Sequence, residues 1–137
     1  MKTFIIIFKC IGIVILSFIV IIIVNLSHDP LINAIVPGQT KDHIPAGSTA
    51  EMISLVVICV AGFLASMVVS LLAGKQRLIL LWILLVLFLA ADLQAVLTDL
   101  ALTDLWYRVL TISSVPLQIW LGYQFTVRFF NSARLDR

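Results

Sequence analysis

The chain has 137 residues, of which 62% are hydrophobic and 12% are charged, and its mean hydropathy is +1.18. Soluble domains carry about 45–50% apolar and about 25% charged residues, so a soluble globular protein and a disordered chain are both excluded. The formal net charge of +2 is small and the charges are scattered, which argues against a nucleic-acid partner. What remains is an all-α integral membrane protein with a single membrane domain over residues 1–137.

Four apolar segments follow one another along the chain. They cover approximately residues 4–26, 50–73, 78–98 and 106–128. Each is close to the ~20 residues that an α-helix needs to cross the hydrocarbon of a bilayer. We therefore expect four transmembrane helices, arranged as an antiparallel bundle or as helical hairpins with short loops.

Residues 27–49 form the only long connection, and they contain three of the four prolines. Prolines interrupt regular backbone, so we expect an irregular loop with one short interfacial helix after Pro30. Ser48 and Glu51 have the spacing of a capping box, in which the two side chains cap the start of a helix. This pattern predicts that the second span begins there.

The basic residues predict how the chain is oriented in the membrane. With the N-terminus inside, seven of the nine Lys and Arg residues fall on the inner side, and only Lys41 and Arg108 fall outside. Cytoplasmic loops of membrane proteins carry an excess of Lys and Arg. We therefore expect a multi-pass protein of the bacterial inner (cytoplasmic) membrane with both termini in the cytoplasm and the loop 27–49 outside.

Small residues recur at every fourth position of the second segment, at Gly62, Ser66, Ser70 and Gly74. This spacing lets two helix backbones approach closely, which is how helices associate within lipid. The row predicts a helix-packing seam whose partner lies either inside the chain or outside it. The first segment is almost wholly aliphatic instead, and it suits lipid or an apolar groove on a partner.

Asp92 lies inside the third segment, about 9 Å from its outer end at a rise of ~1.5 Å per residue. A carboxylate at this depth is costly, so we expect it to face protein or water. Thr111, Ser113 and Ser114 on the fourth segment lie at a similar depth, and Gln118 lies deeper. We favour a structural hydrogen bond from Asp92 to the fourth segment. A proton, cation or ligand site formed by Asp92, Ser114 and Gln118 is the alternative.

The sequence indicates neither a metal site nor a cofactor. Cys10 and Cys59 lie in separate apolar segments, and the sequence contains no CxxC. His28 and His43 have carboxylates beside them, but their spacing is irregular, so we interpret them as solvated loop residues rather than metal ligands. The sequence also lacks HExxH, G-x-S-x-G and glycine-rich phosphate-binding motifs, so we do not expect an enzyme.

Two functions remain. We favour a non-catalytic small integral membrane subunit or accessory protein of a larger membrane complex, whose partners are other membrane protein subunits or further copies of itself, together with lipid. The alternative is a small homo-oligomeric transporter or channel with an outward-facing acidic site at Asp92. Its weakness is the inner half of the segments, which carries no acidic residue and, apart from Lys9 and the segment ends, no charge, since ion paths normally carry polar groups across the membrane. An enzyme acting on lipid or quinone is disfavoured by the missing motifs.

Overall fold

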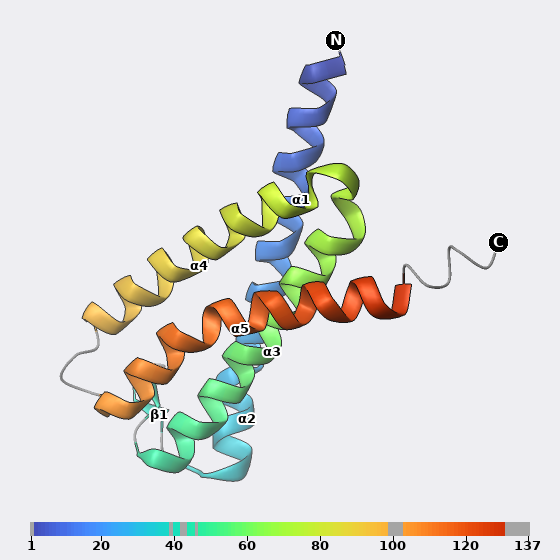
Figure 1. Cartoon of the computed structure of the whole chain (residues 1–137). Helices are drawn as coiled ribbons and strands as arrows, with labels where there is room; N and C mark the ends of the chain where they lie inside the picture. The colour runs from blue at the N-terminus through green and yellow to red at the C-terminus, as the bar shows by residue number, and fades with distance from the viewer. Residues whose placement is uncertain (1, 39, 42–43, 46, 99–102, 131–137) are drawn as a thin grey trace.

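The computed structural model describes residues 2–38, 40–41, 44–45, 47–98 and 103–130, which are almost wholly helical (Figure 1). The helices are α1 (Lys2–Leu26), α2 (His28–Ile35), α3 (Ser48–Leu72), the short 3-10 helix η1 (Gly74–Gln76), α4 (Arg77–Thr98) and α5 (Leu105–Phe130). Two-residue strands β1 (Thr40–Lys41) and β2 (Ile44–Pro45) pair antiparallel, with Thr40 opposite Pro45 and Lys41 opposite Ile44. The all-helical class predicted from the composition is confirmed.

Three helical segments are long and apolar enough to cross a membrane, namely Phe4–Ile35, Ser48–Leu72 and Gly74–Thr98. They correspond to the first three predicted segments, and they make this chain a membrane protein by the length and composition of its helices. Helix α5 has 26 residues, so its length would also suffice. It is not among the sufficiently apolar segments of the described chain.

Helix α3 forms the centre of the structure, because it packs against each of the other long helices and most extensively against α5 and α1. All four long helices contribute to the core cluster, with Ile13 from α1, Val69 from α3, Leu84 from α4 and Val115 from α5 among its members. The N-terminal half of α1 projects beyond this core in Figure 1, and only 11% of the helix's most apolar stretch is buried. This half of α1 therefore presents an aliphatic surface to its surroundings.

The row of small residues on α3 faces α5. Gly62 and Ser66 are buried, and a Cβ added at Gly62 would overlap Oε1 of Gln118 on α5. A Cβ added at Gly122 of α5 would lie 2.6 Å from the carbonyl oxygen of Phe63 and closer still to Oγ of Ser66. The two helices thus approach so closely that neither glycine leaves room for a side chain.

The row changes character toward the end of α3. Ser70 is buried, and its Oγ has no hydrogen-bond partner among the described residues. Gly74 lies beyond the end of α3, in η1, and no atom lies within 4 Å of a Cβ built there. Its φ of +57° instead serves the turn between α3 and α4, a conformation that glycine adopts without steric cost. The fourth member of the predicted seam is therefore a turn residue and not a packing residue.

The start of α3 differs from the predicted capping box. Its N-cap is Gly47, with φ of +101°, and no side chain caps the helix. Glu51 reaches α5 instead, where its Oε1 accepts a hydrogen bond of 2.8 Å from the backbone N–H of Asp104. Asp104 directly precedes α5, so Glu51 satisfies one of the free N–H groups at that helix start. One carboxylate thus joins the beginnings of two helices.

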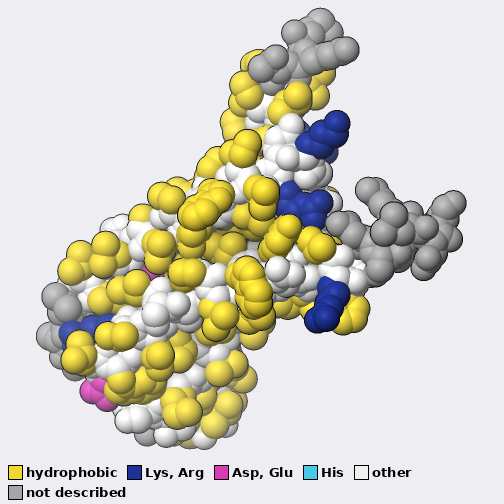
Figure 2. Space-filling model, viewed as in Figure 1, with side chains coloured by type: hydrophobic (Ala, Val, Ile, Leu, Met, Phe, Trp, Pro, Cys, Tyr) yellow, Lys and Arg dark blue, Asp and Glu magenta, His cyan; other side chains and the backbone are white. Residues whose placement is uncertain are grey.

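Most charged side chains lie toward one of the two ends of the molecule. Figure 2 shows most Lys and Arg side chains near the start of α1 and the end of α5, whereas the opposite end carries Asp and Glu together with a further basic side chain. Among the described residues that side chain is Arg108, which donates to Thr103 near the start of α5. The described basic residues at the first end are Lys9, Lys75, Arg77 and Arg128, and Arg77 lies over the ring of Tyr123 at 5.8 Å from its centroid. We call this end the basic end, and the end that carries α2 and β1–β2 the loop end.

Candidate functional site

An open cavity of about 730 Å³ lies at the loop end, where α2 and the neighbouring ends of the four long helices meet. Aliphatic and polar side chains share its walls. The polar residues that line it are Asn25, His28, Asp29, Ser54, Asp92, Thr103, Tyr107 and Thr111. Within the described chain the lining holds two carboxylates and no Lys or Arg. This balance suits a neutral or positively charged ligand.

Asp92 lines this cavity from α4 and is half-buried. No hydrogen bond or ion pair joins its carboxylate to another described residue. The serine hydroxyls that sequence placed at its depth bind elsewhere, because Ser114 donates to the Thr111 carbonyl oxygen at 2.9 Å and Ser113 to that of Leu110 at 3.4 Å. The hydrogen bond that we favoured between the third and fourth segments is therefore not formed, and the carboxylate faces the cavity.

A smaller cavity of about 140 Å³ adjoins the first and reaches deeper between the helices. Asp92 and Asn25 line both cavities, so Asp92 lies where the two meet. Gln118 lines the smaller one, and its Nε2 donates a hydrogen bond of 2.7 Å to Oγ of Ser114. The structure thus brings Asp92 and Gln118 to one cavity, whereas Ser114 holds the amide of Gln118 in position.

Buried polar groups continue from this cavity along the contact between α3 and α5. Oγ of Ser66 donates to the carbonyl oxygen of Phe63 at 2.8 Å, and Oγ1 of Thr126 donates to that of Gly122 at 2.8 Å. The buried Ser70 lies on the same side of α3. The contact between α3 and α5 therefore carries uncharged hydroxyl groups toward the basic end.

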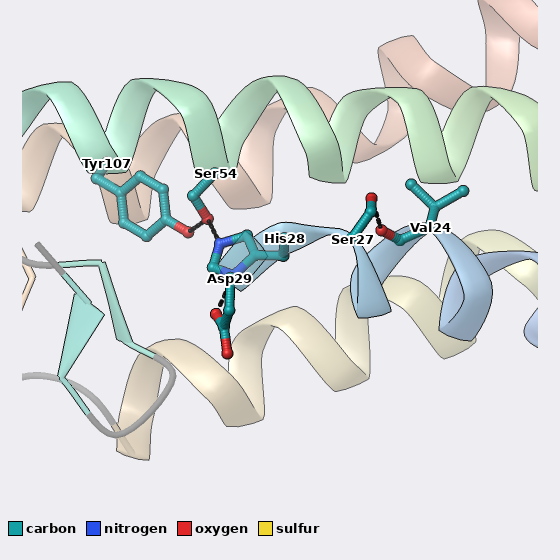
Figure 3. A network of polar contacts seen from close by, with 6 residues as sticks. All are labelled: Val24, Ser27, His28, Asp29, Ser54 and Tyr107. Carbon is teal, nitrogen blue, oxygen red and sulfur yellow. Dashed lines mark hydrogen bonds and ion pairs between the residues drawn. The ribbon is translucent and has the colours of Figure 1, made fainter. Parts of the chain in front are cut away.

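A chain of hydrogen bonds forms one wall of the larger cavity (Figure 3). The hydroxyl of Tyr107 on α5 and Nε2 of His28 on α2 each lie 2.8 Å from Oγ of Ser54 on α3. Nδ1 of His28 lies 2.8 Å from Oδ1 of Asp29. These hydrogen bonds therefore join three helices and hold α2 against the cavity.

The order of carboxylate, imidazole and serine hydroxyl also occurs in hydrolases that use an activated serine. Ser54 differs from such a nucleophile because it is only 2% exposed and shares its hydroxyl with Tyr107. The N–H groups around Ser54 lie within α3, where each donates to the carbonyl four residues earlier. Acyl transfer needs free donors for the developing oxyanion. The contacts therefore favour a structural tie between helices over a catalytic centre.

The interpretation of His28 as a solvated loop residue is wrong, because it begins α2 and its side chain is only 15% exposed. In the sequence, the Asp29–Pro30 pair is typical of the first residues of a helix. It was the one indication that His28 lies at the start of a helix and not in a loop. His43 lies outside the described residues. Among those that are described, no three His, Cys, Asp or Glu side chains are placed to hold a metal ion.

No protein-family model, curated protein or solved structure matches this chain. The class that fold and site define is an all-helical membrane protein with a polar, acidic cavity at one end. Any function must therefore be argued from the chemistry of that cavity and from the surfaces around it.

Proposed function

We propose that the protein is a small transporter or channel for cations that uses an outward-facing acidic site at Asp92. The observation that carries the proposal is this carboxylate, which is half-buried, has no partner within the described chain and lies where two cavities meet. An ionisable group at the centre of a membrane span costs about 2.5–3.5 kcal/mol. A carboxylate that gains no bond from its own protein is suited to bind something from outside.

The arrangement of the chain in the membrane is part of this proposal. We take α5 as a fourth span because its 26 residues reach about 39 Å and it packs along α3. The separation of the basic end from the loop end supports a cytoplasmic position for both termini. The cavity then opens to the outer side of a bacterial inner membrane, and the protein acts as a homo-oligomer without an enzymatic step.

Electrophysiology on solid-supported membranes tests the proposal. Vesicles that contain the purified protein are exposed to pulses of inorganic and organic cations, and the movement of charge is recorded. We expect at least one cation to move charge in the wild-type protein. Asp92→Asn should abolish the signal, because an amide keeps the shape of the carboxylate but carries no charge.

Asp104→Asn is the matched control for this experiment. Asp104 is an exposed carboxylate at the same end of the molecule, and it does not line the cavity. Its substitution should leave the signal at the wild-type level. The proposal is overturned if no cation moves charge, or if Asp92→Asn behaves like the wild type.

A second function, an accessory subunit of a larger membrane complex, is favoured by the surface of α1. Its first turns carry large apolar side chains that are more than half exposed, namely Phe4, Ile5, Ile7 and Phe8. These side chains fit lipid or a groove on another membrane protein. Gentle detergent extraction followed by mass measurement separates the two functions. Foreign membrane chains in the particle favour the accessory subunit, and a self-oligomer favours the transporter.

A further inference from the structure

We infer that the cavity at the loop end takes an organic cation, with an ammonium group on an apolar body, and not a bare inorganic ion or a proton. The inference rests on the proposed function and names the substrate class of the same site. Three properties of the cavity carry it, namely its volume, its supply of oxygen ligands and the chemistry of its walls.

The volume sets the first limit. At about 730 Å³ the cavity falls within the roughly 300–1,000 Å³ that protein pockets for small organic molecules occupy. A proton needs no cavity, and a single metal ion would leave most of this space to water. The volume therefore fits a molecule that has a carbon skeleton.

The supply of oxygen ligands sets the second limit. A hard cation such as Ca²⁺ takes about 6–8 oxygen ligands at ~2.3–2.6 Å. Asp29 is engaged with His28, which leaves Asp92 as the unpaired carboxylate among the described residues of the lining. One carboxylate neutralises one positive charge but does not complete the coordination shell of a bare ion. An ammonium group needs only that counter-charge and one or two hydrogen-bond acceptors.

The walls supply what the rest of such a ligand requires. Ile22, Ile58 and Val96 line the cavity and offer aliphatic contacts to an apolar body. Thr111 is buried in the same lining one helical turn from Tyr107, and no hydrogen bond of regular geometry satisfies its Oγ1 in the described chain. A buried hydroxyl without a partner is unfavourable. The N–H of a bound amine would give Thr111 the hydrogen bond that it lacks.

Thermal unfolding of the full chain in detergent measures binding without knowledge of the natural substrate. The probe is N,N-dimethylbenzylammonium, the form that dimethylbenzylamine takes at neutral pH. Isobutylbenzene has the same shape but neither charge nor N–H, and sodium chloride supplies a bare ion. A ligand that binds only the folded state raises the Tm. We expect a saturable rise with the ammonium compound and none with the other two at equal concentration.

Three variants assign the effect to residues. Asp92→Asn should weaken binding of the ammonium probe about tenfold or more, and Thr111→Val should weaken it by a smaller factor. Asp104→Asn should leave it unchanged. Circular dichroism and gel filtration establish that each variant is folded. The nearly isosteric Thr111→Val provides a second test should Asp92→Asn be unstable.

Each further outcome counts against the inference. An equal rise in Tm with isobutylbenzene would show that the pocket binds apolar molecules without regard to charge. Binding of the ammonium probe that persists in Asp92→Asn would show that Asp92 does not bind the positive charge. A rise with sodium alone that depends on Asp92 overturns the organic substrate but keeps the cation site of the proposed function. If neither cation stabilises the protein and none moves charge in vesicles, the inference and the proposed function both fall.

Discussion

The lack of a protein partner for Asp92 determines what its substitution does to stability. If Asp92 tied α4 to α5, Asp92→Leu would remove a hydrogen bond of about 0.6–1.7 kcal/mol. No described residue binds the carboxylate, so we expect Asp92→Leu and Asp92→Asn to keep or raise the free energy of unfolding, because a costly group is removed. Unfolding in detergent measures the effect. A clear loss of stability in both variants would reveal a structural partner.

Ser54 has the opposite character, because its hydroxyl serves two neighbours at once. Ser54→Ala leaves the Tyr107 hydroxyl and Nε2 of His28 without their shared partner. Each buried polar group left unpaired costs about 1–3 kcal/mol, so we expect a loss of at least that size in the free energy of unfolding.

Ser70→Ala is the matched control for Ser54→Ala. Ser70 is buried on the same helix, but its Oγ has no hydrogen-bond partner among the residues described. Its replacement should leave stability unchanged or raise it. Equal losses from the two serine variants would contradict the hydrogen-bond chain.

Asp92 could be predicted as a site residue from the sequence, whereas His28 could not, and the reason is physical. A carboxylate inside an apolar run stands out without any structure, and counting the helical rise places polar residues of the next span near its depth. His28 follows the end of a span, in a connection rich in proline. Its contact with Ser54 depends on how α2 packs against α3, a tertiary arrangement that spacing along the chain does not encode.

At the scale of helices, the sequence predicted the α3 surface of the contact between α3 and α5 but not the α5 surface. The spacing of Gly62 and Ser66 predicts close approach but names no partner. The matching feature on α5 is a single glycine, Gly122, with Gln118 one turn before it. An isolated glycine has no period, so nothing in the sequence links it to the row on α3.

Three helical glycines should differ in their tolerance of alanine. At Gly122 the new Cβ meets the backbone oxygen of Phe63 at 2.6 Å, so α3 itself must move. We expect the largest loss there, at or above the about 1–3 kcal/mol of overpacked cores. At Gly62 it meets the end of the Gln118 side chain, which can turn aside if it gives up its hydrogen bond to Ser114, so the loss should be smaller than at Gly122.

Gly12 on α1 is the matched control, since nothing lies within 4 Å of a Cβ built there. Gly12→Ala should be neutral or stabilising by up to about 1 kcal/mol, because alanine favours the helix. Thermal unfolding of the three variants gives their order. Any order other than Gly122, Gly62, Gly12 would contradict the packing of α3 on α5.

Helix α5 has a lower mean hydropathy than the other long helices, and its packing explains why. Thr111, Gln118 and Thr126 lower its mean hydropathy, yet all three are buried. Polar groups that face a neighbouring helix are compatible with a membrane span, because they do not meet lipid. Composition cannot distinguish a buried polar residue from one that is exposed, so the mean hydropathy of this helix does not by itself decide between a membrane span and a surface helix.

At the scale of the whole molecule, composition sets the membrane class, whereas orientation depends on a few charges. The prediction of both termini inside rests on the basic residues at one end, and the crossing of α5 decides where the C-terminus lies. Both points can be tested with single cysteines in a background where Cys10 and Cys59 are replaced by alanine. The three positions are Pro37 at the loop end, Gln76 in η1, and a cysteine appended after Arg137.

An impermeant maleimide should label the cysteine at Pro37 in intact cells, and the cysteines at Gln76 and after Arg137 only after lysis. The reason is that four crossings return the chain to the side from which it started. With three crossings, Pro37 and Gln76 would react as before, but the appended cysteine would be labelled in intact cells. That position therefore decides whether α5 crosses the membrane. Labelling at Gln76 but not at Pro37 in intact cells would invert the orientation and place the cavity on the cytoplasmic side.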